Sequence, residues 1–202
     1  MPKLLRRKKY PGPKIRSFEK RKRSVSRVST TYEHFDPETG FSIFERELSI
    51  KQIELMMHFK NLGLNVEEPF LDNKGNLIVI GKDKNYRRIL TKNKGKTLDL
   101  LFPDLVKPNR KVALEIISQL AELLARIHEE GYCFYHPKPA NVVWDGRKVG
   151  LIDFKVTSIF QSVRAETELN MFLYTVRSVG LSPQNSEVQK ALKRLDEAKP
   201  KK

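Results

Sequence analysis

The stretch that decides the fold is residues 128–155, HEEGYCFYHPKPANVVWDGRKVGLIDFK. Its first part completes an apolar helical pattern, and the glycine that follows is typical of a helix end. A loop with Lys138 and Asn141 comes next, and the dipeptide Asp145-Gly146 then predicts a tight hairpin turn. The stretch therefore predicts a helix, a polar loop and a hairpin whose second strand runs into Asp153.

Three polar residues of this stretch predict a site. Asn141 and Asp153 stand twelve residues apart, on the two sides of the hairpin, so their oxygens can meet at one cation. Lys138 stands beside them and can bind a phosphate group. The residue types and their spacing therefore indicate phosphate and magnesium chemistry.

The rest of the chain predicts a strand-rich first part with one helix, followed by a mainly helical part. Ser49 and Gln52 resemble a capping box at the start of the first helix. Helices are expected over residues 50–62, 111–130, 167–180 and 186–195, and strands over 24–32, 41–44, 77–80, 88–91, 141–144 and 149–152. This order predicts the α+β fold class.

The order of these elements and the motifs at their ends resemble the protein-kinase-like superfamily. The chain resembles in particular the small atypical kinases, namely the RIO kinases and the kinase of the KEOPS-type tRNA-modification complex. Lys138-Pro139-Ala140-Asn141 is similar to the second half of the family's catalytic loop, and Leu151-Ile152-Asp153-Phe154 is similar to its metal-binding motif. The resemblance extends over about residues 25–182 and is strongest over 120–182.

The resemblance implies a two-lobed fold with a nucleotide cleft between the lobes. A small antiparallel-sheet lobe with one helix would span residues 24–91, and a mainly helical lobe would span 92–195. Residues 91–98 would form the hinge between them. The first 23 residues would be a basic flexible arm, and residues 196–202 a basic tail.

The resemblance also implies a ligand set, with ATP and Mg²⁺ as cofactors. Asn141 and Asp153 would hold the metal, and Lys138 would contact the γ-phosphate. The strand lysine that pairs with the phosphates in this family is missing, and Arg46 or Lys51 would replace it. The partner carboxylate on the first helix would be Glu54, with Gln52 as the alternative position.

Several departures from the family pattern argue against ordinary phosphoryl transfer. His136 stands where the catalytic aspartate is expected, and Lys155 replaces the glycine after Asp-Phe. Residues 24–35 contain no glycine that would form a phosphate-covering loop. We therefore expect a degenerate kinase-like protein, a pseudokinase. The sequence leaves open whether this pseudokinase binds a nucleotide. One alternative is an active serine/threonine kinase in which a neutral His136 accepts the hydroxyl proton.

The charge is concentrated at the N-terminus. The chain has 202 residues and a net charge of +15, and residues 1–28 contain 12 Lys or Arg and one acid, Glu19. Such an arm predicts electrostatic binding to RNA or a ribonucleoprotein. A solubilising tail and a membrane-surface segment remain open, as does a protein partner. A second alternative for the whole chain is a basic nucleic-acid-binding protein unrelated to kinases.

Other classes find little support in the sequence. No apolar run is long enough for a transmembrane segment and no secretory signal is evident, so we expect a cytoplasmic protein. Cys133 is the single cysteine, which excludes an intramolecular disulfide. His128, Cys133 and His136 have a spacing that can bring three zinc ligands together, but no fourth ligand is apparent.

Overall fold

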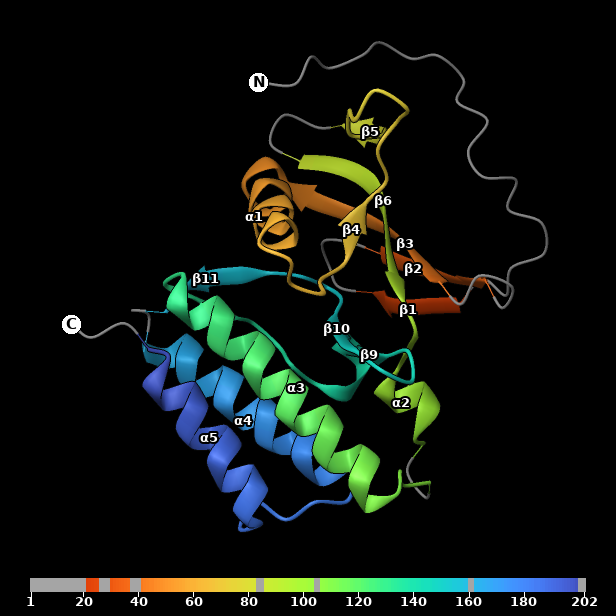
Figure 1. Cartoon of the computed structure of the whole chain (residues 1–202). Coiled ribbons are helices and arrows are strands. Elements are labelled where there is room, and N and C mark those ends of the chain that lie inside the picture. The colour runs from red at the N-terminus through yellow and green to blue at the C-terminus, as the bar shows by residue number, and fades with distance from the viewer. Residues whose placement is uncertain are drawn as a thin grey trace.

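The computed structural model describes residues 21–25, 30–36, 41–82, 86–103, 106–159 and 162–199. The first 20 residues of the predicted arm and residues 200–202 of the predicted tail lie outside this description. A β-sheet with one helix forms one end of the molecule, and the helices α3, α4 and α5 form the other (Figure 1). The expected α+β class with antiparallel sheets is confirmed. We call residues 21–94 the sheet part and residues 95–199 the helical part.

The sheet part is built on an antiparallel sheet with the strand order β1-β2-β3-β6-β4, and β5 pairs with β6. Its strands are β1 (Arg21–Val25), β2 (Thr30–Asp36), β3 (Phe41–Ser49), β4 (Glu68–Pro69), β5 (Val79–Lys82) and β6 (Tyr86–Lys94). The longest pairing joins β3 to β6, from Phe41 opposite Lys94 to Ser49 opposite Tyr86. The strands expected over residues 77–80 and 88–91 correspond to β5 and β6, which pair antiparallel with each other.

The first expected strand is wrong in its extent. Residues 24–32 do not form one strand, because β1 ends at Val25 and β2 starts at Thr30. Strand β1 also begins at Arg21, inside the segment predicted as a free arm, and pairs with β2. The β-branched residues of this stretch correctly indicated extended backbone, but they carried no signal for the break between the two strands.

Helix α1 (Ile50–Asn61) follows β3 directly and lies beside the sheet (Figure 1). It buries Ile53, Met56 and Phe59, which are spaced three residues apart and so share one face. Ser49 caps its N-terminus, because its hydroxyl accepts the backbone N–H of Gln52 at 3.2 Å. Only this half of the expected capping box forms, since the Gln52 side chain bonds elsewhere.

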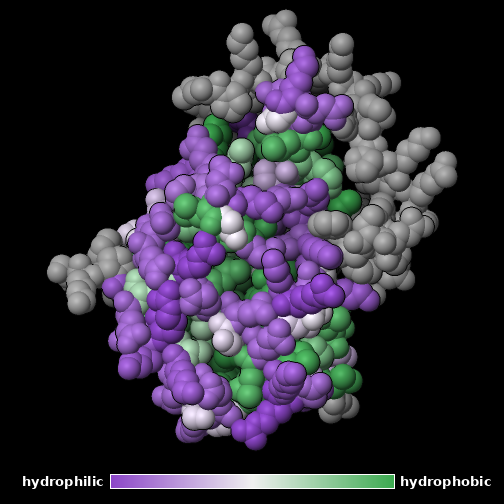
Figure 2. Space-filling view, viewed as in Figure 1, coloured by the Kyte–Doolittle hydropathy of each residue, from purple (hydrophilic) through white to green (hydrophobic). Residues whose placement is uncertain are grey.

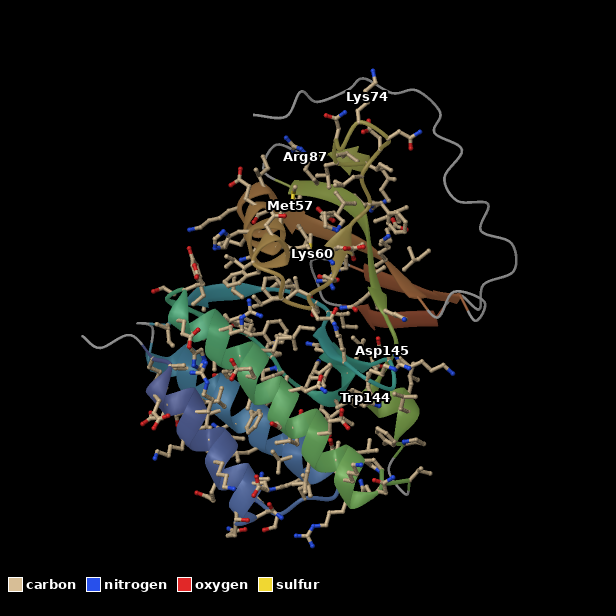
Figure 3. The ribbon with its side chains drawn as sticks, in the orientation of Figure 1. Met57, Lys60, Lys74, Arg87, Trp144 and Asp145 are labelled. Carbon is tan, nitrogen blue, oxygen red and sulfur yellow. The ribbon has the colours of Figure 1, made fainter. Side chains whose placement is uncertain are left out.

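The chain passes from the sheet part to the helical part at Gly95, within the predicted hinge. Gly95 has φ +102°, and a Cβ there would lie 2.6 Å from the carbonyl oxygen of Trp144. Only glycine therefore fits this crossing. Strand β7 (Lys96–Thr97) and the short helix α2 (Leu98–Leu101) follow. Trp144 and Asp145 are labelled in Figure 3, close to the end of β6.

The helical part has its core along α3 (Arg110–Glu129), which packs against α5 (Ser186–Glu197) and borders α4 (Ser162–Ser178) (Figure 1). One face of α3 is fully buried, as its periodicity predicted. The buried residues of α3 include Ile116, Ile117, Leu120, Leu124 and Ile127. Burying one such side chain contributes about 1.5–3 kcal/mol. All the predicted helices are present, and α4 starts five residues earlier than expected.

Short strands lie between the two parts. The expected hairpin is β9 (Val142–Trp144) and β10 (Val149–Leu151), which pair with each other, and β9 also pairs with β7. A 3-10 turn, Pro139–Asn141, precedes β9. Strands β8 (Tyr132–Phe134) and β11 (Val156–Ser158) form a further pair that the sequence did not predict. Each has only three residues, too few for an alternating pattern to be recognised.

The surface in Figure 2 is mostly hydrophilic, with separate hydrophobic patches over both parts. Among the described residues, no helix is long and apolar enough to cross a membrane.

Candidate functional site

The centre of the candidate site is Asp153, which follows β10. It is the only non-glycine residue with a positive φ, +53°, in the described part of the chain. Its Oδ1 accepts a hydrogen bond from Nη2 of Arg46 and lies 3.4 Å from Nζ of Lys155. Burial alone would raise the pKa of Asp153, but the charges of Arg46 and Lys155 outweigh it and hold that pKa below its usual value. The carboxylate is therefore ionised and already bound to two cations.

Arg46 comes from β3 and is one of the two alternatives for the missing strand lysine. The residue is only 3% exposed, and its Nη1 lies 3.7 Å from Oε2 of Glu67. Burial would lower the pKa of Arg46, but Glu67 and Asp153 outweigh it and raise the pKa further. The structure brings Arg46 to Asp153, whereas Lys51 is exposed on α1. Arg46 thus connects the sheet part to the end of the hairpin.

Glu67 completes this buried cluster, and the sequence reasoning missed it. It is fully buried, and its Oε1 accepts the backbone N–H of Phe154 at 2.8 Å. Its Oε2 accepts the hydroxyl of Thr91 at 3.1 Å. The surrounding pattern carried no signal, because Leu64 and Val66 are buried and strict alternation would turn residue 67 outward. Within the sheet part, the acidic partner of Arg46 is therefore Glu67, in the segment after helix α1.

Helix α1 contributes an amide to the region and not a carboxylate. Gln52 donates to the carbonyl of Val156 at 3.1 Å and accepts the Val156 N–H at 3.3 Å. Glu54, the other expected position, is exposed on α1 and is not brought to Asp153. Of the two alternatives, the structure brings Gln52 to the segment after Asp153.

The loop before the hairpin carries the remaining predicted residues. Asn141 is buried, and its Nδ2 donates to the backbone carbonyl of His136 at 3.0 Å. Lys138 is exposed, and its carbonyl accepts the N–H of Asn141 at 2.8 Å. Burial, followed by the positive charge of Lys138 and then that of Lys155, lowers the pKa of His136, while Asp153 acts in the opposite direction. The structure thus gathers His136, Lys138, Asn141 and Asp153, with His136 neutral at pH 7.

The segment after α1 ties the sheet part to the hairpin. Leu151 donates its N–H to the carbonyl of Asn65 at 3.0 Å and accepts the N–H of Glu67 at 2.8 Å. The Asn65 side chain donates to the carbonyl of Val149 at 2.8 Å. These bonds hold Glu67 at a fixed position against the end of β10.

The donor set does not fit the expected Mg²⁺ site. Magnesium in proteins is bound by one or two carboxylates together with phosphate oxygens and water. Here the single carboxylate of the expected pair, Asp153, is neutralised by Arg46 and Lys155. No group of three or more His, Cys, Asp or Glu residues suited to a metal ion occurs in the described ranges. The accessible charges beside Asp153, on Lys138 and Lys155, favour an anion.

A second buried polar cluster lies among the helices. Nε2 of His128 is 2.9 Å from Oε2 of Glu168, and Nδ1 of His128 is 3.2 Å from the carbonyl of Leu195. The Glu168 carboxyl also accepts the N–H of Phe134 at 3.3 Å. Since a carbonyl only accepts, Nδ1 carries a hydrogen, and a proton must also lie between Nε2 and Oε2. Burial raises the pKa of Glu168 against the opposing effect of His128. His128 is thus a structural residue of α3.

No protein-family model matches this chain, and no curated protein sequence matches it.

Proposed function

We propose that the chain is a catalytically degenerate, protein-kinase-like protein that does not transfer phosphate from ATP. The order of its elements supports this proposal: a sheet with one helix, a glycine crossing, a long helix, a polar loop and a hairpin that ends at Asp153. The residues predicted from the kinase-like motifs, His136, Lys138, Asn141 and Asp153, also gather at the end of that hairpin.

The single observation that carries the proposal is that two cationic side chains already bind the Asp153 carboxylate. In phosphoryl transfer the protein acts mainly by positioning the phosphates and neutralising charge with metal ions. Asp153 is instead bound by the buried Arg46 and by Lys155. The neutral imidazole of His136 also replaces a carboxylate at the position of the general base. Metal binding and proton removal are both weakened by this set of residues.

A phosphotransfer assay tests the proposal. The full-length protein is incubated with γ-labelled ATP and Mg²⁺. Label is then measured on the protein itself and on two kinds of added substrate, proteins that bind RNA and general kinase substrate proteins. We expect no transfer above a sample without the protein. Magnesium-dependent transfer that is lost in His136→Ala and in Asp153→Asn, but kept in Glu187→Gln on α5, would overturn the proposal. That result would favour the alternative, an active serine/threonine kinase.

We also propose that the basic N-terminal arm binds RNA or a ribonucleoprotein. The support is its composition, because residues 1–20 contain eight Lys or Arg residues and one acid. Lys and Arg release counterions when they neutralise phosphates, so binding should weaken steeply with salt. We expect log K to fall by about 0.7 per contacted phosphate for each unit of log salt on single-stranded RNA.

The test uses a full-length variant with those eight residues replaced by Gln. Replacement stops at residue 20 because Arg21 begins strand β1. We expect the variant to lose most of the salt dependence of binding to a single-stranded RNA, measured by fluorescence anisotropy. An unchanged slope would show that the arm does not carry RNA binding.

A further inference from the structure

Lys138 and Lys155 form an exposed cationic pair beside His136. Lys138 is exposed on the loop before the hairpin, and the Lys155 side chain is 48% exposed just after Asp153. Tyr135, the neighbour of His136 in the chain, donates its N–H to the carbonyl of Lys155 at 3.0 Å, and Lys138 follows His136 by two residues. They therefore share one surface region next to the Asp153 carboxylate.

We propose that Lys138, Lys155 and His136 form a site for a polyphosphate anion that binds without a divalent metal ion. This inference rests on the proposed function, because it assigns a ligand class to the same site. Arg46 and Lys155 supply the positive charge that a metal ion would otherwise bring to Asp153. The ligand class is a compound with linked phosphates, such as pyrophosphate or the triphosphate of a nucleotide.

The charge balance favours an anion over a cation. The site has three fixed cations, Arg46, Lys138 and Lys155, against two carboxylates, Glu67 and Asp153. Arg46 is bound to both carboxylates and Lys155 is bound to Asp153, so these two cations compensate the two negative charges and the charge of Lys138 is the surplus. A divalent ion would meet a region of surplus positive charge, whereas a phosphate would remove that surplus.

The hydrogen-bond inventory also favours phosphate. Each lysine ammonium carries three donors and no acceptor, and a neutral imidazole keeps one N–H donor. Lys155 uses one contact on Asp153, at 3.4 Å. Within the described part of the chain, Lys138 has no ion-pair partner. The exposed face of the site is thus rich in donors, which phosphate oxygens can accept.

The sign of the magnesium effect separates this site from a metal-dependent one. A nucleotide complexed with Mg²⁺ carries two fewer negative charges than the free nucleotide. At a site that binds through lysines, Mg²⁺ therefore weakens binding by lowering the charge of the ligand. At a site that binds through a bridging metal, Mg²⁺ strengthens it.

Isothermal titration calorimetry with pyrophosphate and with ATP tests the inference. The protein is the full-length form with the eight arm residues replaced by Gln, so that the arm does not contribute. We expect measurable binding of both ligands in EDTA and at least a threefold loss of affinity with excess Mg²⁺. Lys138→Ala and Lys155→Ala should each lower the affinity tenfold or more, while the exposed control Lys111→Ala on α3 should leave it unchanged. Far-ultraviolet circular dichroism checks that each variant is folded.

The inference is overturned if neither ligand binds in EDTA, if binding requires Mg²⁺, or if Lys138→Ala and Lys155→Ala behave like Lys111→Ala. These results would not overturn the proposed function. Only transfer of phosphate from ATP in the phosphotransfer assay would do so. A protein that needs Mg²⁺ to bind ATP and transfers no phosphate would refute the metal-free site alone.

Discussion

Replacement of Arg46 by Met should strongly destabilise the protein. Arg46 is buried between Glu67 and Asp153, and Met is a long, unbranched side chain that can occupy much of the same space. The substitution leaves Glu67 fully buried without its cation, whereas Asp153 keeps Lys155. The main cost therefore arises at Glu67.

The magnitude follows from this burial. Removing one partner of a buried ion pair costs about 3–5 kcal/mol, because the other charge stays buried and uncompensated. For a protein of this size, each 1 kcal/mol lowers Tm by about 2–4 °C. We therefore expect Arg46→Met to lower Tm by about 6–20 °C.

Urea unfolding at pH 7 measures this cost, followed by the fluorescence of Trp144. Trp144 is the single tryptophan and is 7% exposed, so its emission reports loss of the core. The matched control is Arg194→Met. Arg194 is a surface arginine that also contacts two acids, Glu122 at 2.9 Å and Glu129 at 2.7 Å. Exposed ion pairs contribute little, so the control should cost about 1 kcal/mol or less.

A double-mutant cycle separates the pair from the rest of the site. Glu67→Gln keeps an oxygen to accept the Phe154 N–H and removes the charge. The double variant Arg46→Met/Glu67→Gln should be more stable than the sum of the single effects predicts, by about 1–3 kcal/mol. Additive costs, or an Arg46→Met cost no larger than that of Arg194→Met, would refute the argument.

Two further predictions concern other parts of the fold. Because burial raises the pKa of Glu168, its contribution to stability is fully present below the ordinary glutamate pKa of about 4.3 and is lost as the pH rises through the raised value. Glu168→Gln, whose amide can donate to His128, should remove this pH dependence of the unfolding free energy, and a slope equal to that of the wild type would contradict the assignment. Gly95→Ala should destabilise by about 2 kcal/mol or more, since its Cβ would meet the Trp144 backbone at a positive φ. The control Gly63→Ala has a positive φ but open space, so its cost in thermal unfolding should be only about 1 kcal/mol; equal costs for the two glycines would refute the close-contact argument.

The candidate site was predictable from sequence only in part. Lys138, Asn141 and Asp153 could be singled out from the sequence because they flank one hairpin and lie close together along the chain. Arg46 was found as one of two alternatives. Glu67 was not found, because its burial depends on the segment after α1 bonding to Leu151, which is far away in the sequence. The choice between Gln52 and Glu54 likewise depended on which face of α1 turns toward Val156.

The sequence by itself determined the main helices, the hairpin and the position of the excess charge. Apolar periodicity located α1 and α3, and Asp145-Gly146 located the hairpin, because these signals act between residues close in the chain. Only the tertiary structure decided the partners of the buried charges. Arg46 and Asp153 are 107 residues apart, and a charge pattern does not specify which distant opposite charge will meet it. Arg46 meets Asp153 because the sheet part packs on the hairpin. Buried charges must be paired, so the fold determines which opposite charges become partners.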